Sequence, residues 1–237
     1  LTARPSQTEE ATCPHALYGH VPNDTSYSVG HWLRDLKPLL AGARPIIVGG
    51  TGLNFTALPE GLAAIPPTPA EVRARADAAE PSDLLEALDA ATVARIDTAN
   101  PARIRRAWEV LESTGRGLAD WQDDTGPPLL PLAQTQPIVL NAAPEWLTPR
   151  IDQRFDIMLK SGALDEVRAQ LANWNAQRPS SRAIGAGELV AYLNGQMTLD
   201  AARDRAVILS RQYAKRQRTW FRARMGGWTQ LDAASMR

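Results

Sequence analysis

A glycine-rich turn behind a short apolar run is the first stretch whose residue types could do chemistry. The run Pro45–Val48 predicts a strand buried on both faces, and Gly49, Gly50, Thr51 and Gly52 follow it directly. At the carboxyl end of a strand in an open α/β sheet, such glycines leave backbone N–H groups bare for a phosphate or another substrate. The same turn also occurs for purely steric reasons, so for the turn alone both interpretations stay open.

A long basic helix near the end of the chain is the second such stretch. Thr198 can cap it, and we expect it to run from Leu199 to about Met225. At 100° per residue it carries one narrow basic stripe, which consists of Arg211, Lys215, Arg218 and Arg222. Because the protein as a whole is neutral, this stripe favours contact with a phosphate backbone over a merely solvated helix face.

The opposite face of the same helix is apolar. It carries Leu209, Tyr213 and Trp220 and is expected to pack on the core. Arg216 falls on this side, so its guanidinium must either extend to solvent or meet an anion inside the protein.

A second predicted helix combines clear end signals with arginines. Asn100 is suited to cap it, Pro101 to start it and Gly115 to end it. Its inner face carries Ile104, Trp108 and Leu111. Arg103 and Arg106 lie to one side of that face and Arg105 points elsewhere. A solvated surface is the ordinary interpretation of these arginines if the helix stands alone.

Two more segments place arginines at helix starts. A helix that begins at Thr148-Pro149 carries Arg150 and Arg154, four residues apart. Such a pair can hold a polyanion, and pairing with Asp152 or Asp156 is the alternative. The segment 182–188 sets an arginine beside small, flexible residues, where backbone can approach a ligand closely.

Composition narrows the classes of function. The 237 residues are 44% hydrophobic and carry 26 basic and 26 acidic side chains, so only a local charge can attract nucleic acid. The single Cys13 cannot form an internal disulfide, and no segment is apolar enough to span a membrane, which favours the cytoplasm. Cys13, His15 and His20 lie close in sequence but supply too few ligands for a zinc site, so we predict no metal site there.

The order of elements predicts an α/β core that is interrupted by helices. Residues 1–30 read as loop, residues 27–40 as a helix capped by Ser28, and residues 137–140 as a strand. Between them, a proline-rich linker at 65–69 opens a stretch with helical sequence only. We therefore expect a core formed by residues 1–67 and 137–237, and an inserted helical domain at 68–136.

The motifs of this chain, taken in order, resemble the bacterial tRNA dimethylallyltransferases, also called tRNA isopentenyltransferases. The resemblance extends over essentially the whole chain. It is carried by Gly49–Leu53, Glu71–Arg73, Asn100–Val110, Arg150–Asp156, Arg182–Gly185 and Tyr213–Arg222. It implies a P-loop NTPase-like parallel sheet flanked by helices, with an all-helical insertion. It also implies transfer of the dimethylallyl group of dimethylallyl diphosphate to N6 of the adenosine immediately 3′ of the anticodon, in tRNAs that read codons beginning with U.

The resemblance further implies which residues contact the tRNA anticodon stem-loop. Thr51, which would orient the reactive base, and Arg73 match positions near that base. The other matching positions are Ala102, Arg103, Ile104, Arg105, Arg106, Arg182, Ala183, Ile184, Gly185, Lys215, Arg216, Gln217, Arg218, Thr219, Trp220, Phe221 and Arg222. We expect the diphosphate at Gly49, Gly50, Gly52, Arg150, Arg154 and Arg216. Its Mg²⁺ would be held mainly by the diphosphate and by an N-terminal segment that the sequence does not include. The enzyme is expected to be a monomer.

Some family features are absent from the sequence. The phosphate-binding G-x-x-x-x-G-K-[ST] loop and the aspartate that serves as general base do not occur, and we expect an N-terminal segment that carries both. The region between Arg73 and Asn100 is several residues short. The family's Tyr-Arg pair is Ala186-Gly187 here, and its frequent Tyr is Asn54. The alternatives are an isopentenyltransferase for free adenine nucleotides and a truncated, non-catalytic tRNA-binding fragment.

Overall fold

The computed structural model describes residues 4–42 and 44–236 and divides into two compact units. Unit 1 comprises Leu1–Asn54 and Ala133–Arg237, and unit 2 comprises Phe55–Leu132. The unit boundaries fall at 54/55 and 132/133, whereas the sequence analysis placed them at 67/68 and 136/137. Helix α3 (Gly52–Glu60) begins in unit 1 and continues into unit 2, and the short 3-10 helix η2 (Leu132–Gln134) lies at the second boundary.

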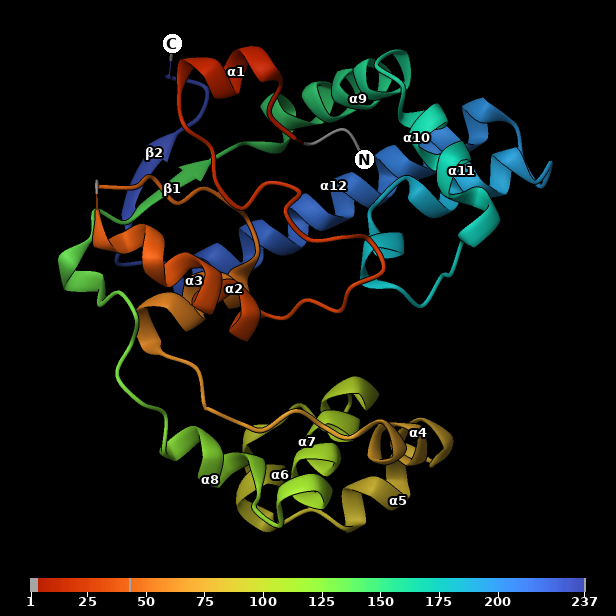
Figure 1. Cartoon of the computed structure of the whole chain (residues 1–237). Helices are drawn as coiled ribbons and strands as arrows, with labels where there is room; N and C mark the ends of the chain where they lie inside the picture. Colours follow the sequence, from red (N-terminus) through yellow and green to blue (C-terminus); the bar gives the residue numbers. More distant parts are fainter. Residues whose placement is uncertain (1–3, 43, 237) are drawn as a thin grey trace. The chain divides into compact units, whose positions relative to one another are not determined.

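Unit 1 is organised around the long helix α12 (Leu199–Arg224), which Thr198 caps by accepting the N–H of Ala201. Helices α9 (Pro144–Lys160) and α11 (Ala186–Leu193) pack against α12, and α10 (Ala163–Gln170) packs against α9 and α11 (Figure 1). The core between them is built from Phe155, Ala206 and Val207, with a second cluster of Ala163, Val167, Leu189 and Val190. The alanines allow the helices to approach closely. The 3-10 helices η3 (Leu171–Asn173) and η4 (Pro179–Arg182) connect α10 to α11.

A small parallel sheet completes unit 1. Strand β1 (Ile138–Asn141) pairs in parallel with β2 (Thr229–Asp232), with Ile138 opposite Thr229 and Asn141 opposite Asp232 (Figure 1). The strand predicted at 137–140 is thus confirmed, one residue later. The described part of the chain is therefore a helix-rich α/β fold.

The strand predicted at Pro45–Val48 is wrong. This segment is irregular, and the side chains of Ile46 and Val48 are 90% and 73% exposed. An apolar run becomes a strand only when a neighbouring strand completes its hydrogen-bond ladder, and among residues 4–42 and 44–236 β1 and β2 pair only with each other.

Each of the first two helices of unit 1 begins directly after a serine that caps it. Residues 1–30 were expected to be loop, but α1 (Gln7–Thr12) forms where Ser6 and Glu9 make a reciprocal capping box. Ser28 caps α2 (Val29–Leu36) as predicted. The helix then tightens into the 3-10 helix η1 (Lys37–Ala41), which has a proline in its first turn.

Unit 2 is helical throughout. Its helices are α4 (Ala70–Ala78), α5 (Pro81–Glu86), α6 (Ala90–Arg95), α7 (Pro101–Thr114) and α8 (Leu118–Asp123), and α4, α5 and α8 pack against α7. The predicted cap, start and end of α7 are confirmed: Asn100 accepts the N–H of Ala102, and Gly115 adopts the left-handed conformation. On the inner face Ile104 is buried and Trp108 and Leu111 are half-buried. Buried Ala107, Glu109 and Val110 complete the face.

Candidate RNA and substrate site

The glycine turn and the last helix, predicted separately as site segments, lie together in unit 1. The side-chain amide of Gln217 donates a 2.9 Å hydrogen bond to the carbonyl of Gly50. The indole of Trp220 packs so closely on Gly52 that a Cβ atom there would come within 2.5 Å of the ring. Thr51 between them is exposed, and α3 begins at the next residue. The turn therefore offers an exposed hydroxyl at a helix N-terminus, where backbone N–H groups favour anions.

Two arginines of α12 are used to hold α9. Arg203 makes a bidentate pair with Asp156, at 2.8 Å from Nε and 2.9 Å from Nη2. These hydrogen bonds lower the pKa of Asp156. Arg211 donates to Asp152 at 2.6 Å and 2.7 Å. Arg211 belongs to the basic stripe predicted from the sequence, but the packing of α9 on α12 brings Asp152 beside it and compensates its charge.

The C-terminal half of α12 keeps its positive charge. Among the described residues, no carboxylate lies within ion-pair distance of its basic side chains Lys215, Arg216, Arg218 and Arg222. Lys215, Arg216 and Arg222 are exposed, and Arg218 is half-buried. Thr219 is exposed, and Trp220 and Phe221 make an edge-to-face contact at 6.0 Å. This half of the helix can therefore contact phosphates.

The apolar face predicted for α12 is partly wrong. Tyr213 is 39% exposed, and the buried residues are Ala202, Ala206, Val207 and Ala214. Small side chains form the packed face because α12 lies close to its neighbours. Arg216 extends to solvent, which is one of the two outcomes expected for it. Its guanidinium carbon Cζ lies 5.8 Å from the centroid of the Tyr213 ring, on which it stacks.

The two arginines of α9 differ from each other. The guanidinium of Arg150 lies 3.6 Å above the ring of Trp146 and donates to the Trp146 carbonyl at 2.8 Å. Arg154 is exposed and has no carboxylate partner within the described part of the chain. Neither pairs with Asp152 or Asp156. Arg154 is thus the freer of the two to bind an anion.

The segment from Arg182 to Gly187 forms the start of α11. Arg182 and Ala183 are exposed and Ile184 is half-buried, whereas Gly185 is buried with φ of 94°. The N–H of Gly185 donates to the carboxylate of Glu188, which also faces Arg205 at 3.7 Å. The left-handed conformation requires glycine at 185. Ala186, which stands where the family has Tyr, is 4% exposed.

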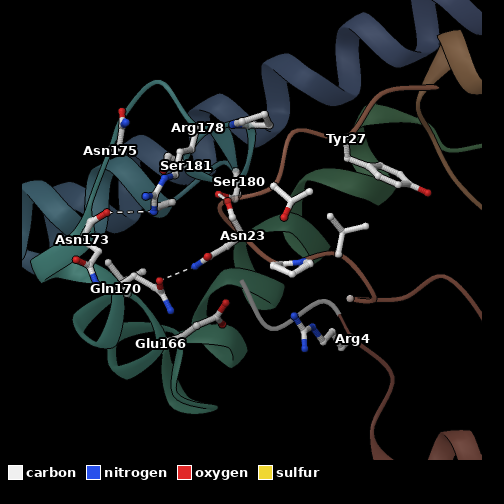
Figure 2. A pocket seen from close by; sticks show the side chains of 18 of the residues that line it. Arg4, Asn23, Tyr27, Glu166, Gln170, Asn173, Asn175, Arg178, Ser180 and Ser181 are labelled. Carbon is white, nitrogen blue, oxygen red and sulfur yellow. Dashed lines mark hydrogen bonds between the residues drawn. The ribbon is translucent and has the colours of Figure 1, made fainter. Parts of the chain in front are cut away.

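A cavity of about 1210 Å³ lies beside this segment in unit 1. Ala183 and Ala186 line it, together with the loop around Asn23 and the residues between α10 and η4. Figure 2 shows Asn23 facing Gln170, to whose side-chain oxygen its amide donates a hydrogen bond of 2.5 Å. The guanidinium of Arg178 donates a hydrogen bond to the carbonyl of Asn173. These residues carry no signal in the sequence, because their amides and hydroxyls are scattered over two distant segments and form no local motif.

A hydrogen-bonded cluster at one side of the cavity contains His20, Tyr27 and Asp35. The Tyr27 hydroxyl donates to Asp35 at 2.7 Å, and His20 Nε2 lies 3.1 Å from that hydroxyl and 3.2 Å from the carboxylate. Burial, and then the bond to Asp35, raise the pKa of Tyr27 to about 12, and the bonds from Tyr27 and His20 lower that of Asp35. His20 thus serves this cluster, while His15 contacts the carbonyl of Cys13.

In unit 2, the arginines predicted to contact tRNA have different surroundings. Ala102 and Arg103 are both exposed, and Arg103 has no carboxylate partner among the described residues. Arg73 and Arg106 are exposed and flank Glu109. Arg105 is half-buried, and its Nε is buried without a hydrogen-bond partner in the described residues. Ile104 is 3% exposed, so its side chain belongs to the core and is not a surface contact.

The described residues contain neither a membrane-spanning helix nor a metal-binding group of side chains. No helix is long and apolar enough to cross a membrane. No group of three or more His, Cys, Asp or Glu side chains is arranged to hold a metal ion.

Comparison with known proteins gives concordant matches. Residues 1–224 match the sequence model of a family described as IPP transferase. A tRNA dimethylallyltransferase from Dinoroseobacter shibae is 61% identical over 241 residues, which cover 99% of this chain and 81% of the relative. The crystal structure of the full-length tRNA isopentenylpyrophosphate transferase from Bacillus halodurans is 29% identical with a TM-score of 0.64, over 98% of this chain and 75% of that one. A eukaryotic dimethylallyltransferase acting on tRNA shares the fold, with a TM-score of 0.79 at 22% identity over 96% of this chain and 62% of that one.

Proposed function

The chain belongs to the IPP transferase family, and from this we propose that it transfers a dimethylallyl group from dimethylallyl diphosphate to tRNA. The acceptor would be N6 of the adenosine immediately 3′ of the anticodon, in tRNAs that read codons beginning with U. The observation that carries the proposal is the meeting of the glycine turn with the basic half of α12, through Gln217 on Gly50 and Trp220 on Gly52. The proposed substrate site and the proposed RNA-binding surface would thereby be adjacent within unit 1. The proposal extends to a P-loop NTPase-like core and to a monomer that acts in the cytoplasm, where tRNA is modified.

The reaction needs an adenine that has left its stack. An enzyme reaches a base inside an RNA loop by extruding it into a pocket, where side chains orient it. Thr51 is suited to this task because its hydroxyl is exposed beside Trp220 and Gln217. The neighbouring indole offers a flat apolar surface to the base or to the dimethylallyl chain.

The leaving diphosphate gains negative charge as the allylic C–O bond breaks. Preorganised cations and backbone N–H groups stabilise that charge best. We assign this role to Gly49, Gly50 and Gly52 and to the guanidiniums of Arg154 and Arg216, which have no carboxylate partner among the described residues. Arg150 is a weaker candidate, because its guanidinium is already stacked on Trp146 and bonded to a carbonyl. Mg²⁺ would arrive with the diphosphate, since the described residues offer no cluster that fits it.

The tRNA would be held by phosphate contacts from both units. In unit 1 these come from Arg182 and from Lys215, Arg216, Arg218 and Arg222; in unit 2 they come from Arg73, Arg103 and Arg106. This set of cations, in which Arg73 and Arg106 share the carboxylate of Glu109, favours tRNA over free adenine nucleotides, which need only a few charges.

The test is transfer to an unmodified tRNA transcript. The purified full-length protein, with the N-terminal segment expected to carry the phosphate-binding loop and the general base, is incubated with the transcript and dimethylallyl diphosphate, and the digested nucleosides are analysed by mass spectrometry. We expect N6-dimethylallyladenosine at the position 3′ of the anticodon, and none in a transcript with guanosine at that position. Transfer to AMP, ADP or ATP that tRNA does not inhibit would instead support the free-nucleotide activity. A lack of product with every acceptor would refute the transferase proposal.

A further inference from the structure

A buried carboxylate lies beneath two of the arginines of unit 2. Glu109 of α7 is 8% exposed, and Glu109 and Thr92 are the buried polar residues of the described chain. Its oxygens face different partners: Oε2 lies 3.3 Å from Nη1 of Arg106, and Oε1 lies 3.9 Å from Nε of Arg73. The carboxylate therefore bridges α4 and α7 at the surface of unit 2.

Both arginine side chains reach solvent above this carboxylate. The side chain of Arg73 is 58% exposed and that of Arg106 is 44% exposed, against 11% for Glu109. Arg106 also donates to the hydroxyl of Thr68, at 2.7 Å, in the linker before α4. The acid thus joins α4 to α7, Arg106 links α7 to the linker, and both guanidiniums beside the acid are exposed.

The arrangement has a physical cost that helix packing alone does not require. Removing a carboxylate from water is unfavourable unless charged partners compensate it, and an apolar side chain at position 109 would pack without that penalty. Two neighbouring guanidiniums also repel each other in the absence of an acid. The carboxylate offsets this repulsion and restricts both side chains, so that their planar donor groups keep a defined spacing.

We propose that Glu109 is a positioning residue for RNA recognition, which holds Arg73 and Arg106 at a spacing that fits phosphates of the bound tRNA. This inference rests on the proposed function, because it takes tRNA as the ligand of unit 2. A fixed pair of guanidiniums loses less side-chain freedom on binding than two free arginines do. Glu109 does not contact the RNA itself.

For Glu109→Gln, the change in net charge and the loss of arginine positioning predict opposite changes in the affinity for tRNA. The substitution adds one positive charge to unit 2, and if charge alone mattered, it would strengthen binding to any RNA. If position matters, it weakens binding to tRNA, because the two arginines lose their common anchor. The sign of the change therefore separates the two effects.

Glu112 supplies a matched control on the same helix. Its carboxylate pairs with Arg75 at 2.6 Å, and its side chain is 39% exposed. Glu112→Gln makes the same change of charge three residues further along α7 without removing a buried anchor.

The experiment measures tRNA binding by fluorescence anisotropy and transfer kinetics for the wild type, Glu109→Gln and Glu112→Gln. We expect Glu109→Gln to raise KM for tRNA and its Kd about tenfold, with kcat changed less than about twofold. Glu112→Gln should bind as tightly as the wild type or slightly more tightly. Equal binding by the two variants, or tighter binding by Glu109→Gln, would overturn the inference.

A double-mutant cycle separates positioning from general damage to the fold. In a protein that carries Arg73→Ala and Arg106→Ala, adding Glu109→Gln should not weaken tRNA binding further, whereas a further tenfold loss would mean that Glu109 acts by another route. Should Glu109→Gln fail to fold, Glu109→Asp keeps the charge but shortens the reach. We expect an intermediate loss of tRNA affinity for it, and unchanged affinity would count against positioning.

The outcome also distinguishes this inference from the proposed function. If the wild type binds tRNA but transfers nothing, the transferase proposal fails, and the binding comparison still decides the role of Glu109. If the wild type modifies tRNA and both variants behave alike, the role of Glu109 fails alone. Absence of any tRNA binding by the wild type would refute both.

Discussion

Gln217 donates its side-chain N–H to the backbone carbonyl of Gly50, across 167 positions of the chain. Together with the packing of Trp220 on Gly52, this bond holds the glycine turn against α12. The exposed hydroxyl of Thr51 therefore takes its position from a helix that is far away in sequence. Substitutions that push the turn and the helix apart should affect both stability and transfer.

Replacing Gly52 with Ala tests this contact. The new methyl group would overlap the ring of Trp220, a stiff group that can yield only by moving as a whole. We expect a loss of about 1–3 kcal/mol in the free energy of unfolding, measured by urea denaturation, and a lower kcat for transfer. Gly187→Ala is the control, because no atom lies within 4 Å of its added methyl group in α11. That variant should gain about 0.5–1 kcal/mol. Wild-type stability of Gly52→Ala would contradict the tight packing of the indole.

Arg222 and Arg211 lie on one stripe of α12 but should behave differently. Arg222 is exposed without a carboxylate partner in the described residues, so Arg222→Ala should weaken tRNA binding. It should also reduce the slope of the logarithm of the tRNA-binding constant against the logarithm of the salt concentration by about 0.7–0.9, and leave the free energy of unfolding unchanged. Arg211 pairs with Asp152, so Arg211→Ala should cost up to about 1 kcal/mol of stability and change the salt slope little. Equal salt slopes for the two variants would disprove this division of α12.

The pair between Asp156 and Arg203 predicts how stability depends on acid. Hydrogen bonds from Arg203 lower the pKa of Asp156 in the folded protein below its value of about 3.9 in an unfolded chain. The pair therefore stabilises the fold fully above about pH 4, and this contribution is lost as the pH falls through the folded pKa. Asp156→Asn should be less stable than the wild type at pH 7, and the difference should shrink below pH 4.

Urea unfolding over this pH range measures the effect. Asp77→Asn is a suitable control, since Asp77 of α4 is exposed and makes no ion pair with the described residues. A constant difference between Asp156→Asn and the wild type down to pH 2 would speak against the charged pair.

Local signals explain what could be predicted from the sequence. The bounds of α7 follow from Asn100, Pro101 and Gly115, each of which acts within one helical turn of the end it marks. The cap at Ser28 acts in the same way. The capping box of Ser6 and Glu9 is an equally local signal, and it starts a helix within a proline-rich stretch that otherwise predicts loop.

Distant partners explain the rest. The segment Pro45–Val48 has a suitable composition for a strand, but a strand requires a ladder that composition cannot supply. The partner of Arg211 lies 59 positions away on another helix, so the sequence could not separate it from Lys215 or Arg222. Glu109 lies where α4 packs on α7 and brings Arg73 to 3.9 Å from its carboxylate, whereas a charged residue on a helix ordinarily predicts solvent.

The division of charge along α12 has a kinetic consequence. The helix has 26 residues, which corresponds to about 39 Å, and its acid partners lie on the N-terminal side while its uncompensated cations lie on the C-terminal side. The positive field of this helix is therefore concentrated at one end, where it can orient an approaching polyanion before contact. Such steering accelerates encounter rather than slowing dissociation. The association rate with tRNA should thus fall steeply with ionic strength, while the ion pairs that fasten α9 keep the scaffold intact.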